Sequence, residues 1–209
     1  TAAHAVRWLK EEAPHHTDRP WTLFLGFVLP HFPLIAPPEF YDRYLDLPPP
    51  RFYAPGERPQ HPVVKEMGRV LCYDDAFDEA KVQVARTAYF GMVSYLDHCI
   101  GQVIGALEET GLRSETRIVY TTDHGDNIGH RGLWGKSNMY EESAAIPMIV
   151  TGADVPRGKA VATPVSLVDC YQTLLEGAGL ELNEEETDAM PGHSLVRIAN
   201  GDTPARTIL

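Results

Sequence analysis

The longest regular pattern in the sequence lies between residues 82 and 107. Apolar residues recur there every three or four positions, which is typical of one face of an amphipathic helix. They are Val82, Ala85, Tyr89, Met92, Val93, Leu96, Ile100, Val103, Ile104 and Leu107. The pattern predicts a long helix, and Gly111 is a natural stop for it.

Strand-like runs stand on both sides of this helix. Residues 21–29 are apolar on both alternating faces, as expected of a strand that is covered on both sides in an α/β sheet. Shorter strands are predicted at 117–122 and 147–150, and further helices from the first residues to about Glu12 and through 168–178. Strands that alternate with helices predict an α/β fold with a mostly parallel sheet packed between helices.

Two local signals add detail to this reading. Ser166 and Asp169 form an acidic variant of the capping box before the helix at 168–178. The stretch from Pro33 to Glu79 is rich in proline and shows no sustained period. We expect it to be a long, partly irregular excursion of the kind that shapes a binding site.

Composition limits the number of domains and the kinds of partner that we expect. The chain has 209 residues, of which 44% are hydrophobic and 22% charged, so it can bury a sizeable core, and we predict one domain over residues 1–209. The net charge of -11 would repel nucleic-acid phosphates, and no Lys/Arg run reverses it locally. No apolar stretch approaches the ~20 residues of a membrane helix. We therefore expect neither a nucleic acid nor a membrane as partner; a homo-oligomer stays open.

The cysteines bear on the compartment. Cys72, Cys99 and Cys170 form an odd, sparse set without a C-x-x-C pair, which suggests neither a disulfide framework nor a zinc knuckle. This favours a cytoplasmic location, with the periplasm or secretion as alternatives. A helical pattern starts directly after Thr1, and Thr207-Ile208-Leu209 has the pattern of an opening strand. We expect a domain that is incomplete at its N-terminus and at its C-terminus.

Polar side chains follow two of the predicted strands. His31 comes after the strand at 21–29, and Asp123-His124-Gly125-Asp126 follows the strand at 117–122. Ligands of open α/β sheets bind beyond such strand ends. Aspartate and neutral histidine are good ligands for a divalent cation, and Gly125 would allow the bend that lets neighbours share one ion. The alternative is a simple polar turn.

The surrounding residues resemble the sulfatase family of the alkaline phosphatase superfamily. Its signature, a strand ending in Asp-His or Asp-Asn with a following Lys, Glu-Glu-Ser and a Pro-led strand, is matched by residues 121–136 (TTDHGDNIGHRGLWGK) and 139–149 (MYEESAAIPMI). The strand ending in Pro-His resembles 27–33 (FVLPHFP), the long helix 89–97 (YFGMVSYLD), and the closing helix and loop 165–169 (VSLVD) and 192–195 (GHSL). With histidine rather than asparagine at position 124, the motif resembles that of the branch containing choline sulfatases and phosphonate monoester hydrolases.

The resemblance implies a role for four residues. Asp123 and His124 would be metal ligands, for calcium, manganese or zinc, which the sequence does not distinguish. His31 would contact the sulfate group or the leaving oxygen, and Lys136 would bind a sulfate oxygen. These groups can stabilise the charge that builds on ester oxygens in the transition state. Glu142 and Asp97 also match, and we interpret them as structural ion-pair partners.

The nucleophile of the family is not found. Sulfatases use a cysteine in C-x-P/A-x-R that is converted to formylglycine, and none of the three cysteines here has that context. The formylglycine is therefore expected in an N-terminal segment outside these residues. The function implied is metal-dependent hydrolysis of small-molecule sulfate esters, with this chain supplying part of the site. The alternatives are a phosphonate monoester or phosphodiester hydrolase of the same superfamily, and an inactive binding domain with the same fold.

Overall fold

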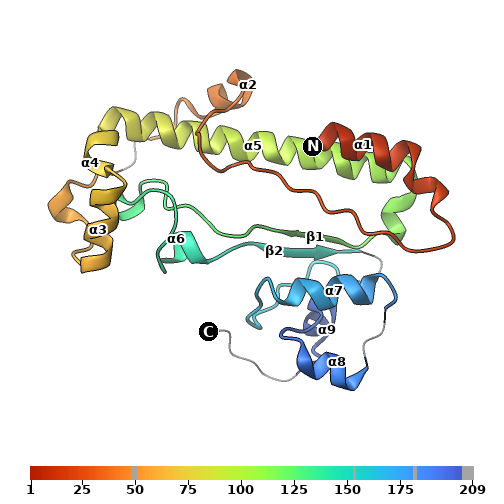
Figure 1. Ribbon diagram of the computed structural model, residues 1–209. Helices are drawn as coiled ribbons and strands as arrows, with labels where there is room; N and C mark the ends of the chain where they lie inside the picture. The colour runs from red at the N-terminus through yellow and green to blue at the C-terminus, as the bar shows by residue number, and fades with distance from the viewer. Residues whose placement is uncertain (49–50, 153, 181–182, 204–209) are drawn as a thin grey trace. The chain divides into compact units, whose positions relative to one another are not determined.

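The computed structural model describes residues 1–48, 51–152, 154–180 and 183–203 (Figure 1). The helices are α1 (Ala2–Glu11), α2 (Pro38–Tyr41), α3 (Pro62–Val70), α4 (Tyr73–Ala76), α5 (Glu79–Glu109), α6 (Glu141–Ala144), α7 (Asp169–Gly177), α8 (Glu184–Ala189) and α9 (Leu195–Asn200). The strands are β1 (Ile118–Thr121) and β2 (Met148–Thr151). Short 3-10 helices lie at Ala13–His15, Asp42–Tyr44, Pro55–Glu57, Leu112–Glu115 and His130–Gly132. The strand predicted at Thr207-Ile208-Leu209 lies outside the described residues.

The chain forms two compact units whose segments alternate along the sequence. The first unit comprises Thr1–Leu25, Gln102–Asp123 and Pro147–Leu209, and the second comprises Gly26–Gly101 and His124–Ile146. The single domain expected over residues 1–209 stays a prediction. Among the described residues, no helix combines the length and the apolar character that crossing a membrane requires.

The predicted long helix and the two short strands are confirmed. α5 ends at Glu109, and Gly111 follows with a left-handed backbone (φ 74°), which is the conformation that favours glycine. β1 and β2 pair antiparallel, with Ile118 opposite Thr151 and Thr121 opposite Met148. Helix–strand alternation predicts parallel neighbours, but the connection between these strands contains only the 3-10 helix at His130–Gly132 and the short helix α6, so it is not a long helical crossover.

In the first unit, Arg117, which directly precedes β1, makes polar contacts with α7 and with Asp154. The Arg117 guanidinium donates to the carbonyl of Thr173 (2.9 Å) and pairs with Asp154 and with Glu176 of α7 (3.2 Å). The hydrogen bond from Arg117 lowers the pKa of the Asp154 carboxyl. One part of the predicted capping box is present, because the carboxylate of Asp169 accepts the N–H of Ser166 (2.8 Å).

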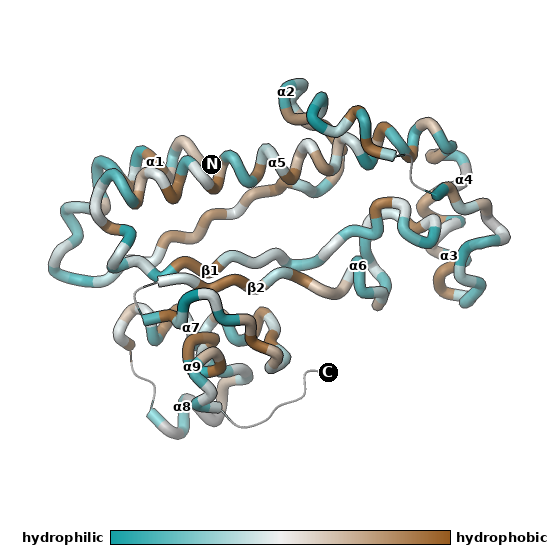
Figure 2. The backbone as a smooth tube through the Cα atoms, turned by 180° about the vertical axis from the view of Figure 1, so that it is seen from behind, coloured by the Kyte–Doolittle hydropathy of each residue, from teal (hydrophilic) through white to brown (hydrophobic). Residues whose placement is uncertain are grey.

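Residues 21–29 differ from the prediction. They are not assigned as a strand, although every second residue is more exposed than its neighbours, which is the period of an extended chain. Phe24 is 90% and Val28 78% exposed. Figure 1 draws this segment without an arrow, and the brown colours of Figure 2 mark it as largely hydrophobic. A strand is defined by its hydrogen-bonded ladder, so apolar alternation alone yields the conformation without the pairing.

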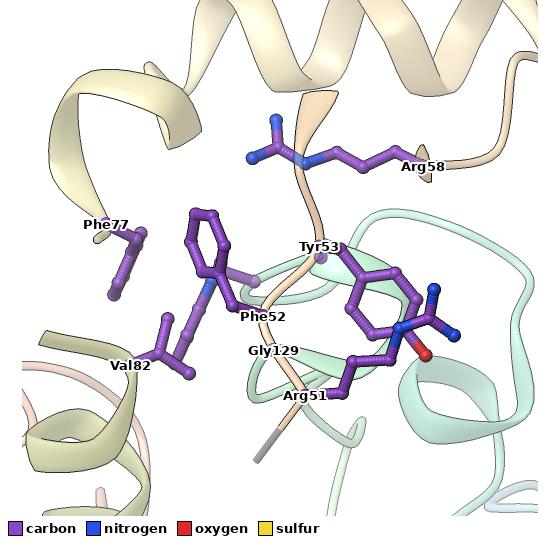
Figure 3. A pocket seen from close by; sticks show the side chains of 9 residues that line it. Arg51, Phe52, Tyr53, Arg58, Phe77, Val82 and Gly129 are labelled. Carbon is purple, nitrogen blue, oxygen red and sulfur yellow. The ribbon is translucent and has the colours of Figure 1, made fainter. Parts of the chain in front are cut away.

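The proline-rich excursion in the second unit contains more helix than its sequence suggests. The helices α2, α3 and α4 lie within it, and the N-terminus of α3 has Pro62 in its first turn and the Nδ1 of His61 as acceptor for the N–H of Val63 (3.3 Å). Figure 3 shows a small pocket where this excursion meets the loop that carries Gly129. Arg51 lies at this pocket and pairs with Glu57 (2.8 Å).

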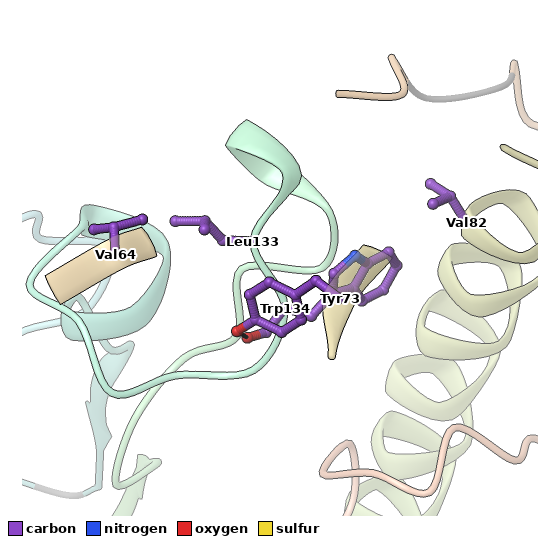
Figure 4. Packing of buried hydrophobic residues seen from close by; sticks show 5 residues of the cluster. All are labelled: Val64, Tyr73, Val82, Leu133 and Trp134. Carbon is purple, nitrogen blue, oxygen red and sulfur yellow. Dashed lines mark hydrogen bonds between the residues drawn. The ribbon is translucent and has the colours of Figure 1, made fainter. Parts of the chain in front are cut away.

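The core of the second unit joins the excursion to the loop after the Asp-His pair (Figure 4). Its buried residues are Val64, Tyr73, Val82, Leu133 and Trp134. The Trp134 ring stacks on Phe77 at 3.9 Å between centroids, and the Tyr73 hydroxyl donates to the carbonyl of Trp134 (2.5 Å). Burial raises the pKa of that Tyr73 hydroxyl. The core therefore holds the segment that leads directly into Lys136.

Candidate active site

His31 lies in a turn between two X-Pro peptide bonds, both of which are cis. Its backbone N–H donates to the carbonyl of Val28 (2.9 Å). The ring Nδ1 is 2.9 Å from the carbonyl oxygen of Phe32, and because a carbonyl only accepts, Nδ1 carries the proton of this hydrogen bond. In a neutral ring the lone pair is then on Nε2, which faces Lys136.

Lys136 reaches His31 across 105 positions of sequence. Its ammonium hydrogen-bonds to Nε2 of His31 and lies 5.4 Å from the centre of the Phe32 ring. An ammonium has three N–H donors, so one bond to His31 leaves two for other acceptors. The structure therefore brings these two residues together, and their catalytic roles stay predictions.

His124 completes a cluster of three side chains within the second unit. Its ring centre is 5.9 Å from that of His31, with the rings edge to face. Its Nδ1 lies 2.8 Å from the carbonyl oxygen of Gly125, so Nδ1 donates, and a neutral ring has its lone pair on Nε2. A histidine that binds a metal is often oriented by such a bond to a backbone carbonyl.

Gly125 is needed at the turn for a reason that the sequence does not reveal. Its N–H donates to the carbonyl of Ser143 (2.9 Å), and a Cβ at this position would lie 2.1 Å from the carbonyl oxygen of Glu142. Contact with α6, and not a left-handed backbone, therefore excludes a side chain. This close approach is what fixes the end of the Asp-His-Gly segment against α6.

Asp123 is exposed and belongs to the first unit, where its Oδ1 accepts from the Thr122 hydroxyl (3.3 Å). Within the described residues, no three His, Cys, Asp or Glu side chains come together as a metal site. The tautomer of His124 and the carboxylate of Asp123 fit two ligands of a divalent cation, whereas hard cations take about six or more donors. The metal roles of both residues stay predictions.

Glu142 of α6 contacts two residues at the tip of the following loop, His130 and Arg131. The carboxylate of Glu142 accepts from Arg131 (2.5 Å) and pairs with His130. A hydrogen bond from its own backbone N–H, together with the Arg131 bond and the nearby charges, lowers the pKa of Glu142. The interpretation of Glu142 as a structural ion-pair partner is confirmed. Asp97 is exposed on α5, and the described contacts include no ion pair to it.

The contacts at the base of this loop were not predicted. The Oδ1 of Asp126 accepts the N–H groups of Ile128 (2.9 Å) and Gly135 (3.1 Å). The backbone N–H and the side-chain Nδ2 of Asn127 both donate to the carbonyl of Gly135 (2.8 and 2.6 Å). The signal available in the sequence was the tendency of Asp to bond the backbone two residues on.

Comparisons with known proteins show the family of the chain. Residues 1–180 match the Sulfatase family model. The choline-sulfatase of Rhizobium meliloti is 36% identical over 92% of this chain and 38% of its own length. Arylsulfatase K of Xenopus laevis is 30% identical over 95% of this chain and 39% of its own length. The chain thus spans about two fifths of these relatives.

A solved structure extends the agreement to the fold. The phosphonate monoester hydrolase of Silicibacter pomeroyi matches 99% of this chain and 42% of its own, with a TM-score of 0.80 and 28% sequence identity. This match confirms the predicted alkaline-phosphatase-like α/β class. Taken with the family match over residues 1–180, it leads to one conclusion. The chain belongs to the sulfatase family of the alkaline phosphatase superfamily.

Proposed function

We propose that the full-length protein containing this chain is a metal-dependent hydrolase of small-molecule sulfate esters, and that this chain supplies part of its active site. The observation that carries the proposal is the hydrogen bond between Lys136 and His31 beside the ring of His124. Lys136 and His31 lie far apart in the sequence, so the fold, and not local spacing, brings them together.

The chemistry of the pair fits an anionic group. With Lys136 donating to Nε2, His31 is a hydrogen-bond acceptor at that atom. To protonate a leaving oxygen, Nε2 has to carry a proton, and two cations would then face each other. An ester oxygen between them would accept from both and remove that repulsion. Lys136 thus stabilises negative charge on the sulfate group, and His31 delivers a proton to the leaving oxygen.

Asp123 and His124 are the proposed ligands of a divalent cation. Bound there, the cation would act as a Lewis acid toward an ester oxygen. Nε2 of His124 would bind it, because Nδ1 is occupied by the carbonyl of Gly125. The further oxygen donors and the formylglycine nucleophile would come from outside residues 1–209, since no cysteine here stands in C-x-P/A-x-R.

Phosphonate monoester hydrolysis is the second candidate. The structural match to such a hydrolase favours it, as does His124, which resembles the branch that includes phosphonate monoester hydrolases. Both ester classes place a tetrahedral anion in the site, so the same groups would serve either. An inactive binding domain is the third candidate, and the His31–Lys136 contact speaks against loss of the site.

The test uses the full-length protein loaded with metal. Its turnover is measured with a chromogenic aryl sulfate, choline sulfate, a phosphonate monoester and a phosphodiester, and its bound metal is quantified. We expect the highest kcat/KM for a sulfate ester. A higher value for the phosphonate would establish the second candidate, and absence of both metal and turnover would establish the third.

A further inference from the structure

We propose that Asp126 is a positioning residue that acts through Lys136. Its carboxylate binds the backbone at both ends of the loop that runs from Asp126 to Lys136, and we call these two bonds the clasp. This inference rests on the proposed function, because it concerns the placement of the ammonium assigned to the sulfate group. It extends that function to a carboxylate for which the sequence motif suggested no role.

The clasp is made at one oxygen atom. Oδ1 of Asp126 accepts from Ile128 N–H (2.9 Å) at the start of the loop and from the N–H of Gly135 (3.1 Å), which lies nine residues after Asp126. Gly135 directly precedes Lys136. One carboxylate oxygen therefore links the start of the loop at Ile128 to its end at Gly135.

Gly135 is held from both sides of its backbone. Its N–H is bound by Asp126, and its carbonyl accepts from the backbone and the side chain of Asn127 (2.8 and 2.6 Å). Asn127 is completely buried, and Gly135 has a left-handed backbone (φ 67°). With both groups of Gly135 fixed, the direction in which the Lys136 side chain starts is fixed as well.

The rest of the loop has separate attachments. Trp134 stacks on Phe77 and its carbonyl accepts from Tyr73, while Arg131 binds Glu142 at the loop tip (2.5 Å). Loss of the Asp126 bonds should therefore loosen the loop at Gly135 without releasing it from the core. The long side chain of Lys136 would carry that loosening to its ammonium, where displacement of about 1 Å can cost about 10²-fold in rate.

The amide variant separates this role from chemistry that needs a charge. Both accepted bonds end on the same oxygen, so the side-chain oxygen of Asp126→Asn can make both of them. Asp126→Ala makes neither. A general base at this position would instead lose its function in both variants, because that role depends on the carboxylate.

Kinetics of the full-length, metal-loaded protein provide the first readout. With a chromogenic sulfate ester, Asp126→Ala should lower kcat about 10- to 100-fold with little change in KM, and Asp126→Asn should stay within about 3-fold of wild type. In a Lys136→Ala background, Asp126→Ala should have almost no further effect, because its influence passes through Lys136. Equal losses in both variants, or a full additional loss in the double variant, would overturn the proposal.

The second readout does not depend on activity, and it keeps the positioning role testable if the proposed function fails. The rate at which an amine-reactive reagent labels Lys136 is measured by mass spectrometry relative to the exposed Lys65. Asp126→Ala should change the relative labelling rate of Lys136 several-fold, and Asp126→Asn should not. An unchanged rate in Asp126→Ala would contradict the proposal whatever the enzyme hydrolyses.

Asp78→Ala is the matched control. Asp78 also accepts a backbone N–H, that of Lys81 (2.8 Å), but it is exposed and precedes α5, and its described hydrogen bond stays within its own helix terminus. Its replacement should leave both the kinetics and the labelling of Lys136 unchanged. A loss equal to that of Asp126→Ala would mean that any broken backbone bond has the same effect, which would contradict a role specific to Lys136.

Discussion

The loop at residues 125–135 and the extended segment at residues 21–29 each lead to a member of the same cluster, but they are held in different ways. In the loop, Asn127 is fully buried and Leu133 is 1% exposed, whereas Phe24 and Val28 in the segment are 90% and 78% exposed. The loop is closed by its own side chains, through Asp126 and Asn127. The segment forms no strand ladder within the described residues, and one backbone hydrogen bond, from His31 N–H to the carbonyl of Val28, is present at its end.

The largest expected effect is the difference in hydrolytic activity between the 209-residue chain alone and the full-length protein. The 209-residue chain, expressed alone, should not hydrolyse aryl sulfates or phosphonate esters above background, because covalent catalysis requires a positioned nucleophile. The exposed apolar residues of the segment should also favour association. Turnover of the chain and of the full-length protein is compared after metal loading, with size measured by light scattering. Comparable turnover from a monodisperse monomer would place a nucleophile within residues 1–209.

A pair of substitutions probes the difference in burial directly. In the 209-residue chain, Trp134→Ala removes the ring that stacks on Phe77 and should lower the free energy of unfolding by about 3–5 kcal/mol. Phe24→Ser should change it by less than about 0.5 kcal/mol and reduce association. Denaturant titration gives both values. Equal losses would show that the segment is packed as firmly as the loop.

Lys136, which follows the end of the loop, is expected to affect the rate of hydrolysis. In the full-length protein, Lys136→Ala should lower kcat on the order of 10²-fold, as expected when one preorganised donor is removed from a site of developing charge. Steady-state kinetics with a chromogenic sulfate ester measure the effect. A change confined to KM would mean that Lys136 binds the ground state and the transition state equally well.

The smallest expected effect lies in the first unit, at the ion pair of Arg117 and Asp154. Because its folded pKa is lowered, the Asp154 carboxylate stabilises the fold above its unfolded pKa of about 3.9, and this contribution is lost as the pH falls through the folded pKa. Its side chain is 55% exposed, so solvent screening limits the contribution to about 0.5 kcal/mol. Asp154→Asn should thus be less stable than wild type at pH 6, with the difference shrinking below pH 4. A difference independent of pH would exclude this cause.

The parts of the fold that could be predicted are those with a local pattern. The apolar period of α5 predicted its existence, and the helix starts earlier than predicted because the carboxylate of Asp78 accepts the N–H of Lys81 at its N-terminus. Residues 21–29 show the limit of such patterns, since a run that is apolar on both faces predicts an extended chain but not its partner. Helix α3 was missed because prolines and charges obscure its short apolar face around Val64.

The candidate site was also predicted only in part from the sequence. His31, His124 and Lys136 were identified by the family motif, and their assembly depends on contacts across 105 positions that no spacing rule could supply. The role of Gly125 in contact with the Glu142 carbonyl and the clasp at Asp126 depend on backbone groups. Residue type indicates the bond from Asp126 to the backbone two residues on, but it does not identify backbone partners further along the chain, such as Gly135 or Glu142.

The central claim, that this chain carries part of a metal-dependent sulfatase site, is tested most directly by the metal content of the full-length protein. The bound divalent cation is quantified by elemental analysis in wild type and in Asp123→Ala, with circular dichroism to verify folding. The account predicts that Asp123→Ala loses most of the metal and the sulfatase activity while remaining folded, because Asp123 is exposed. Stoichiometric metal in a folded Asp123→Ala protein would contradict it.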